Sequence, residues 1–242
     1  MDFIILVYIF FGILPSLVWL SYYLTKDLHP EPKRMILKIF IWGSLITLPV
    51  FFIQIGLTSL LNLANLNPAL WNKIYWFFII ALSEEFFKYL VIRLKVANSP
   101  HLDEPIDLMI YMVVAALGFA AVENILYLFA PIGQMSFYQL VNRALLVDLI
   151  RFIGATFLHT LCSGIIGYSL AVSFCEVKTR KISIFAGIAM ATVLHGLYDF
   201  FIIKLPDPIG FVMPVIIILT LAFLVFSGFK KLEKMKSICK IK

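Results

Sequence analysis

The chain has 242 residues, of which 62% are hydrophobic and only 14% are charged, and its mean hydropathy is +0.99. Soluble domains contain about 45–50% apolar and about 25% charged residues, so this composition excludes an ordinary soluble protein and indicates a polytopic membrane protein. The net charge of +6 does not indicate nucleic-acid binding, because the basic residues lie in short loops and in the C-terminal tail. We therefore expect the lipid bilayer, and no nucleic acid, as the surrounding partner.

Seven stretches reach the roughly 17–25 apolar residues that a membrane-spanning helix requires. In chain order they cover residues 3–24, 35–61, 74–92, 106–130, 144–174, 182–203 and 209–229. The first is predicted to be a permanent helix and not a cleaved signal peptide, because it lacks a basic start and its apolar run is too long. The fifth is too long for one straight span and is expected to include a turn or an interfacial part near either end. The connections leave no room for a soluble domain, so residues 1–242 are predicted to form one integral-membrane domain.

The connections between these stretches alternate in charge. Residues 25–34, 93–105, 175–181 and the C-terminal tail are rich in Lys and Arg, whereas 62–73, 131–143 and 204–208 carry one basic residue each. Basic connections stay in the cytoplasm, so seven helices place the N-terminus outside and the C-terminus in the cytoplasm. The sequence thus predicts an all-α, multi-pass bundle of about seven transmembrane helices in the cell membrane.

Two acidic residues, Glu84 and Glu85, lie in the middle of the third stretch, WFFIIALSEEFFKYLVI. A charged side chain at that depth costs about 2.5–3.5 kcal/mol on insertion scales, which makes the pair a candidate functional site. Lys88 is within one helical turn of both glutamates. Adjacent residues point about 100° apart, so we expect one glutamate to face a cavity and the other to pair with Lys88. The alternative is an ion pair that only fixes helix packing.

The fourth and fifth stretches also carry polar groups. Glu123 and Asn124 occur in GFAAVENILYL, where the small residues allow close helix approach and Asn124 could serve only as an interhelical hydrogen bond. Arg151 and His159 are eight residues apart and share one face of the fifth helix. Asp148 precedes Arg151 by three residues and is expected to neutralise it near the outer interface.

In the sixth stretch, HGLYDF places His195 and Asp199 four residues apart. A carboxylate one turn from an imidazole can hold one ring nitrogen and leave the other as a base or ligand, an arrangement typical of hydrolytic sites. A purely structural His–Asp pair is the alternative. Because four helices bring ionisable groups to similar depth, the sequence predicts one buried polar cavity.

The charges of this cluster do not balance. Four acids, Glu84, Glu85, Glu123 and Asp199, face only two bases, Lys88 and Arg151, which leaves an excess of two negative charges. A cavity of low dielectric requires a protonated carboxyl, a protonated imidazole or a bound cation to offset that excess. A glutamate beside an imidazole could also activate water and pass a proton to a leaving amine.

At these positions the sequence resembles the PrsW family of glutamic-type intramembrane proteases, which are related to the CAAX-processing and bacteriocin-protection membrane proteases. The resemblance is carried by the segments SEEFFK, GFAAVENILY, RALL with HTLCSGIIG, LHGLYDF and the loop KDLHPEPKRMI. Either Arg143 or Arg151 is the arginine of the third of these motifs. It implies hydrolysis of a peptide bond in or at the edge of the membrane, with Glu84, Glu85 and His195 as catalytic residues. It also implies a membrane-protein substrate, which in this family can be a single-pass anti-sigma factor cleaved first (at site 1) in envelope-stress signalling.

The remaining cluster residues are expected to complete the cavity as supporting groups: Lys88, Glu123, Asn124, Arg151, His159 and Asp199. No cofactor is expected, but Glu and His are acceptable zinc ligands, so a zinc-dependent membrane protease is the alternative even though HExxH is absent. The cysteines, Cys162, Cys175 and Cys239, show no disulfide or metal-ligand spacing. A proton-coupled transporter could use the same Glu and His cluster, although no repeated half is visible.

Overall fold

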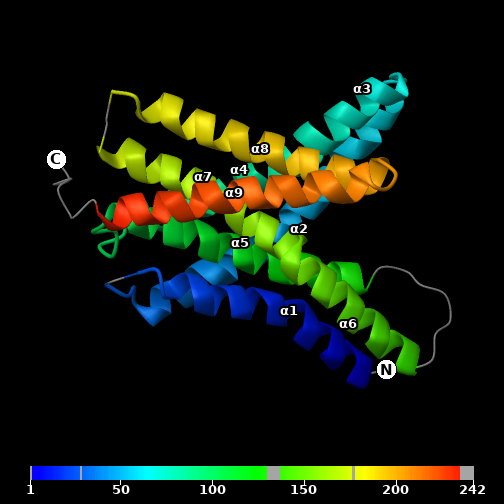
Figure 1. The fold of residues 1–242 in the computed structure, drawn as a ribbon, viewed down its shortest axis with the longest axis horizontal. Coiled ribbons are helices and arrows are strands. Elements are labelled where there is room, and N and C mark those ends of the chain that lie inside the picture. The colour runs from blue at the N-terminus through cyan, green and yellow to red at the C-terminus, as the bar shows by residue number, and fades with distance from the viewer. Residues whose placement is uncertain (1, 28, 130–136, 176–177, 235–242) are drawn as a thin grey trace.

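The computed structural model describes residues 2–27, 29–129, 137–175 and 178–234 (Figure 1). Within these ranges the chain folds into helices and contains no strand, which confirms the predicted all-α membrane bundle. Residues 131–136 of the predicted connection 131–143, two residues of the connection 175–181, and Cys239 with most of the basic tail lie outside the described residues.

The helices follow one another with short connections. They are α1 (Asp2–Leu24), α2 (Lys33–Leu63), α3 (Pro68–Lys73), the π-helix η1 (Ile74–Leu82), α4 (Ser83–Lys95), α5 (Pro105–Leu128), α6 (Phe137–Ile153), α7 (Ala155–Cys175), α8 (Arg180–Lys204) and α9 (Ile209–Glu233). In the described part of the chain, six spans are long and apolar enough to cross a membrane.

Those six spans account for all of the predicted stretches except the third. The third is divided between η1 and α4 and carries three charged residues, so it is not among the six. The fifth, 144–174, does contain a turn, because α6 ends at Ile153 and α7 begins at Ala155. This turn, at Gly154, lies inside the stretch and not near either end as expected.

The central element of the bundle is α5. Every residue of this helix from Pro105 to Ala121 is buried, and the helix packs most extensively against α7, α2 and α1 (Figure 1). A helix that is apolar on all sides must be enclosed by others, which explains why α5 is central. The outer helices instead expose large apolar side chains such as Phe52, Leu60 and Phe223, which form a surface suited to lipid.

Small residues let α2 approach α5 closely. A Cβ atom added at Gly43 would collide with the Ala115 backbone, and one added at Gly118 would collide with the Phe40 carbonyl. Ser44 Oγ also donates a hydrogen bond to the Gly118 carbonyl oxygen, 3.0 Å away. Such small-residue contacts and interhelical hydrogen bonds hold helices together in a bilayer, where apolar burial alone provides little driving force. The predicted close approach at Gly118 is therefore confirmed.

The nine-residue π-helix η1 directly precedes the paired glutamates. π-helical turns are rare and often occur at functional sites. At Gly196 of α8 an added Cβ would lie 2.8 Å from Phe77 Cδ1, so the absence of a side chain there lets α8 pack against η1. Trp76 and Ile80 of η1 and Glu84 of α4 line one cavity together.

The basic connections gather at one end of the bundle. Figure 1 shows the ends of α1, α7 and α9 and the starts of α2, α5 and α8 on the same side, opposite the start of α1. At this end, hydrogen bonds to two carboxylates stabilise the connection between α1 and α2. Asp27 accepts hydrogen bonds from the backbone N–H groups of His29 and Glu31, and Glu31 accepts one from the Tyr111 hydroxyl. Burial raises the pKa of both Asp27 and Glu31. That this end faces the cytoplasm stays a prediction.

The contact between α2 and α5 leads to a stability prediction. Gly118→Ala should destabilise the protein by about 1–3 kcal/mol, because its methyl group cannot be accommodated without separating the two helices. Gly56→Ala is the matched control, since an added Cβ there meets no atom within 4 Å. Thermal unfolding in detergent measures both. Equal melting temperatures for the two variants would contradict the close contact.

Candidate active site

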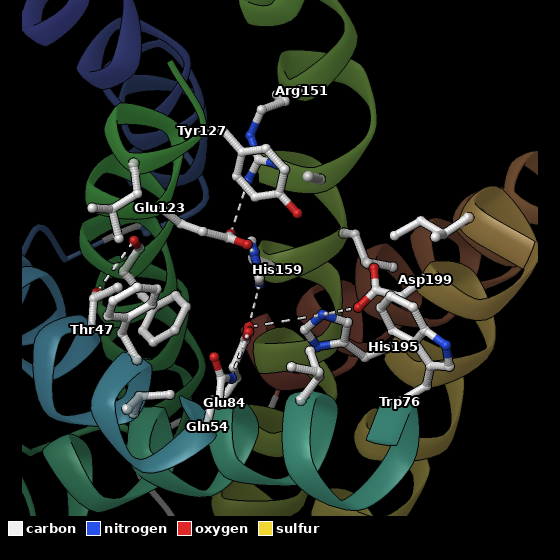
Figure 2. A pocket seen from close by; sticks show the side chains of 18 of the residues that line it. Thr47, Gln54, Trp76, Glu84, Glu123, Tyr127, Arg151, His159, His195 and Asp199 are labelled. Atoms are coloured by element: carbon white, nitrogen blue, oxygen red, sulfur yellow. Dashed lines mark hydrogen bonds and ion pairs between the residues drawn. The ribbon is translucent and has the colours of Figure 1, made fainter. Parts of the chain in front are cut away.

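A cavity of about 350 Å³ lies between α2, η1, α4, α5, α6, α7 and α8 (Figure 2). Its polar lining residues include Thr47, Gln54, Tyr75, Glu84, Glu123, Tyr127, Arg151, His159, His195 and Asp199. Its apolar lining includes Val50, Phe51, Trp76, Ile80, Phe119, Leu126, Leu158 and Ile203. The cavity thus combines an apolar wall with convergent ionisable groups, which is the usual composition of a ligand pocket.

Glu84 faces this cavity with one bonded and one unbonded oxygen. Oε1 accepts a hydrogen bond from Gln54 Nε2 at 3.2 Å. Oε2 is buried without a hydrogen-bond partner and lies 3.9 Å from both His159 Nδ1 and His195 Nε2. Those separations are too long for hydrogen bonds, so this oxygen has no bonded partner among the described side chains.

Glu85 is fully buried and both of its oxygens accept hydrogen bonds. Oε1 accepts hydrogen bonds from Lys88 Nζ at 2.8 Å and from His195 Nδ1 at 2.9 Å, and Oε2 accepts one from Ser163 Oγ at 3.3 Å. The two adjacent glutamates therefore take different positions. Glu84 lines the cavity, and Glu85 binds three side chains behind it.

Each imidazole of the site is held by a carboxylate. His195 donates from Nδ1 to Glu85, and its Nε2 lies 3.4 Å from Asp199 Oδ2. His159 Nδ1 accepts from Lys88 Nζ at 2.8 Å, so its Nε2 carries the hydrogen that is donated to Glu123 Oε2 at 2.6 Å. Asp199 lies one turn from His195, as the spacing predicts, but Glu85 is the closer partner.

Arg151 reaches α5 from the end of α6. Its Nη2 is 2.9 Å from Glu123 Oε2, its Nε donates to Asn124 Oδ1, and its guanidinium carbon lies 4.0 Å from the centre of the Tyr127 ring. The expectation that Asp148 neutralises Arg151 is wrong, because Asp148 forms no ion pair with it and has a buried oxygen without a partner. Two adjacent acceptors on α5 match the planar donor set of Arg151 better than a single carboxylate on its own helix.

All of the predicted site residues are brought into one connected network, though not all of them line the cavity. Glu85 and Lys88 lie behind the lining. Asn124 is a structural hydrogen-bonding residue, whose Nδ2 donates to the Gly12 carbonyl oxygen and to Thr156 Oγ1. Sequence reasoning missed Gln54 and Ser163. A single Gln in the apolar run VFFIQIGL, and a Ser one turn after His159, were the available signals.

The cavity opens on the side of Glu123 and Asp199. Their side chains are 21% and 20% exposed, whereas that of Glu84 is 6% exposed. Glu84 therefore lies at the inner end, and water or a substrate chain would reach it past Glu123 and Asp199.

Glu84, His159 and His195 also form a set of donors that could hold a metal ion, with one donor atom of each within 4.8 Å of the others. The chemistry of these three side chains is compatible with binding a metal ion. Glu84 Oε2 has no other partner, and the far nitrogen of each imidazole already binds a carboxylate, as is usual for metal-bound histidine. A divalent ion would also offset the excess of two negative charges. Metal binding at His159 Nδ1 requires Lys88 to release that nitrogen.

Residues 31–227 match the family described as "PrsW family intramembrane metalloprotease". This range contains every residue of the network described above except Gly12. The chain belongs to the PrsW family. Its membership of this family identifies it as an intramembrane protease. This agrees with the family resemblance of its sequence motifs.

Relatives that carry the name "Protease PrsW" support this membership. The protein from Oceanobacillus iheyensis is 33% identical over 189 residues, covering 78% of this chain and 80% of that protein. The protein from Bacillus subtilis is 30% identical over 233 residues, covering 94% of both chains. The one from Clostridioides difficile is 26% identical over 193 residues. No solved structure matches the chain.

The buried pair of Glu85 and Lys88 leads to a second stability prediction. Lys88→Met should cost about 3–5 kcal/mol of stability, because it leaves Glu85 with an uncompensated charge. The double variant Glu85→Gln/Lys88→Met should recover part of that loss, since both charges are then absent. Lys73→Met, at an exposed site, is the control. Chemical unfolding in micelles measures all three, and a Lys88→Met variant as stable as Lys73→Met would refute the ion pair.

Proposed function

We propose that this member of the PrsW family is an endopeptidase of the cell membrane in which Glu84 activates a water molecule against a peptide bond of a membrane-protein substrate. The observation that carries the proposal is the buried, unpartnered Glu84 Oε2, which faces two imidazoles inside the cavity. A general base needs such an unoccupied acceptor within reach of water. Family membership favours this hydrolase over the proton-coupled transporter.

The proposed reaction begins when Glu84 accepts a proton from water as the water oxygen bonds to the scissile carbonyl carbon. The carbonyl oxygen gains negative charge, and His195 can stabilise it from Nε2 when its imidazole is protonated between Glu85 and Asp199. Protonated Glu84 then gives its proton to the amide nitrogen as the C–N bond breaks. The products are a carboxyl terminus and an amine, and Glu84 is regenerated.

The other residues hold this arrangement in place. Lys88 and Ser163 bind Glu85, which fixes the imidazole of His195. Arg151 binds Glu123, which in turn holds His159. Because these groups lie in a region of low dielectric, their mutual attraction is stronger than in water, and little reorganisation is needed during the reaction.

The substrate we propose is a single-pass membrane protein. The apolar wall of the cavity, with Phe51, Trp76, Leu126 and Ile203, suits the side chains of a membrane segment, and its open side admits water. By the family resemblance of the motifs, the substrate would be an anti-sigma factor cleaved at site 1 in envelope-stress signalling.

A zinc-dependent version of the same protease is the second candidate. It is favoured by the convergent donors Glu84, His159 and His195 and by the charge excess of the cluster. A bound zinc ion would act as a Lewis acid toward water and the carbonyl group. Glu84 would then be a ligand. Of the other two cavity carboxylates, Glu123 is bound to Arg151 and His159, which leaves Asp199 to accept a proton.

The proposed role of Glu84 predicts the result of a cleavage assay. In proteoliposomes that contain a single-pass reporter substrate, Glu84→Gln should lower the rate by about 10²–10⁴-fold, the usual contribution of a general base, and leave the melting temperature unchanged. Glu233→Gln, at the exposed end of α9, should cleave at the wild-type rate. Full activity of Glu84→Gln would overturn the assignment.

Metal analysis separates the two candidates. The glutamate mechanism predicts that the purified protein carries no stoichiometric metal and that chelation leaves cleavage unchanged. The zinc version predicts one metal ion per chain by elemental analysis, its loss in His159→Ala, and restoration of cleavage by added zinc. A metal retained in His159→Ala would contradict the proposed donor set itself.

A further inference from the structure

We infer that Gln54 is the positioning residue that decides which oxygen of Glu84 is presented to the reaction. The inference rests on the proposed function of Glu84. Gln54 belongs to α2, lines the cavity and is thirty residues from Glu84 in sequence, so only the packing of α2 brings the two together. Its Nε2 lies 3.2 Å from Glu84 Oε1 and 3.2 Å from Ser83 Oγ.

The neighbouring serine fixes the orientation of the amide. Ser83 Oγ donates its single hydrogen to the preceding turn, in η1, where the carbonyl oxygen of Ile79 lies at 2.5 Å and that of Ile80 at 3.0 Å. Toward Gln54 the hydroxyl can therefore only accept. The amide must turn its NH₂ group, with its two donors, toward Ser83 and Glu84. The amide oxygen cannot take that place, because it would face two acceptors.

The same hydrogen bond divides the two carboxylate oxygens of Glu84 between different tasks. The terminal torsion of a glutamate is broad, so the carboxylate rotates easily unless one oxygen is held. Within the described part of the chain, Gln54 is the side chain that binds Oε1. With Oε1 held, Oε2 stays 3.9 Å from both imidazoles and 3.7 Å from Lys88 Nζ, close to all three but bonded to none.

Without this donor, the carboxylate can rotate and close an ion pair with Lys88 in place of the longer 3.7 Å contact. Glu84 Oε2 would then be occupied, and water would lose its acceptor. The hydrogen bond from Gln54 to Glu84 lies within the enzyme and does not involve the substrate. Its loss should accordingly lower kcat and leave KM nearly unchanged.

The test is the steady-state cleavage of a single-pass reporter by the full chain in proteoliposomes. Gln54→Met keeps the length of the side chain but removes the amide, and we expect kcat to fall about ten- to a hundredfold, as for a lost hydrogen bond to a charged group, with KM and the melting temperature kept. Ser59→Ala, another polar position on α2 whose hydroxyl bonds only within its helix, is the control and should match the wild type.

Gln54→Asn is the second variant, and it carries the test alone if Gln54→Met does not fold. Its amide is one methylene shorter and cannot span the present distance, so kcat should again fall with KM kept. An unchanged kcat in either folded variant, or a loss confined to KM, overturns the role of Gln54. Failure of the wild type to cleave, or full activity of Glu84→Gln, would instead overturn the proposed function.

Discussion

The whole site depends on the hydrogen bonds and the ion pair that stabilise Glu85, a carboxylate buried inside a membrane bundle. Lys88, His195 and Ser163 bind its two oxygens, and they come from α4, α8 and α7. A buried charge is tolerated only when it is paired and hydrogen-bonded, so these contacts fix the three helices relative to one another. Because the adjacent residue must point about 100° away, the same constraint turns Glu84 out of the pairing network and into the cavity.

The rest of the fold brings partners to that carboxylate. The glycine contacts between α2 and α5 place α2 close enough for Gln54 to reach Glu84. The π-helix η1 leads directly into the glutamates, and its wall of Trp76 and Ile80 continues into Glu84 on one side of the cavity. Stability and function are thus divided between two neighbouring residues of the same type. The hydrogen bonds of Glu85 stabilise the structure, whereas Glu84 has one oxygen without a hydrogen bond.

The sequence was sufficient to predict the all-α bundle, from its long apolar stretches, and the cluster, because the energetic cost of a charge in a bilayer marks such residues individually. A turn was expected near an end of residues 144–174, whereas it lies at Gly154 inside the stretch. The length of an apolar stretch shows that it must be broken but does not show where. It could not predict which glutamate faces the cavity, since that depends on how η1 and α4 are rotated against α7 and α8. The partner of Arg151 was predicted wrongly from local spacing, because a nearby helix offered Glu123 and Asn124. Gln54 was missed because an uncharged amide in an apolar run carries little cost and its partner is distant in sequence.

In the proposed mechanism, Glu84 Oε2 accepts the proton of the attacking water. The most direct measurement is a high-resolution structure of the protein in a membrane mimetic with a peptidyl ketone, whose hydrate imitates the tetrahedral intermediate. We expect one hydrate oxygen to lie within hydrogen-bonding distance of Glu84 Oε2 and the other near His195 Nε2, with Glu85 still bound to Lys88. A hydrate bound through Glu85 or Asp199, with Glu84 turned away, would contradict it.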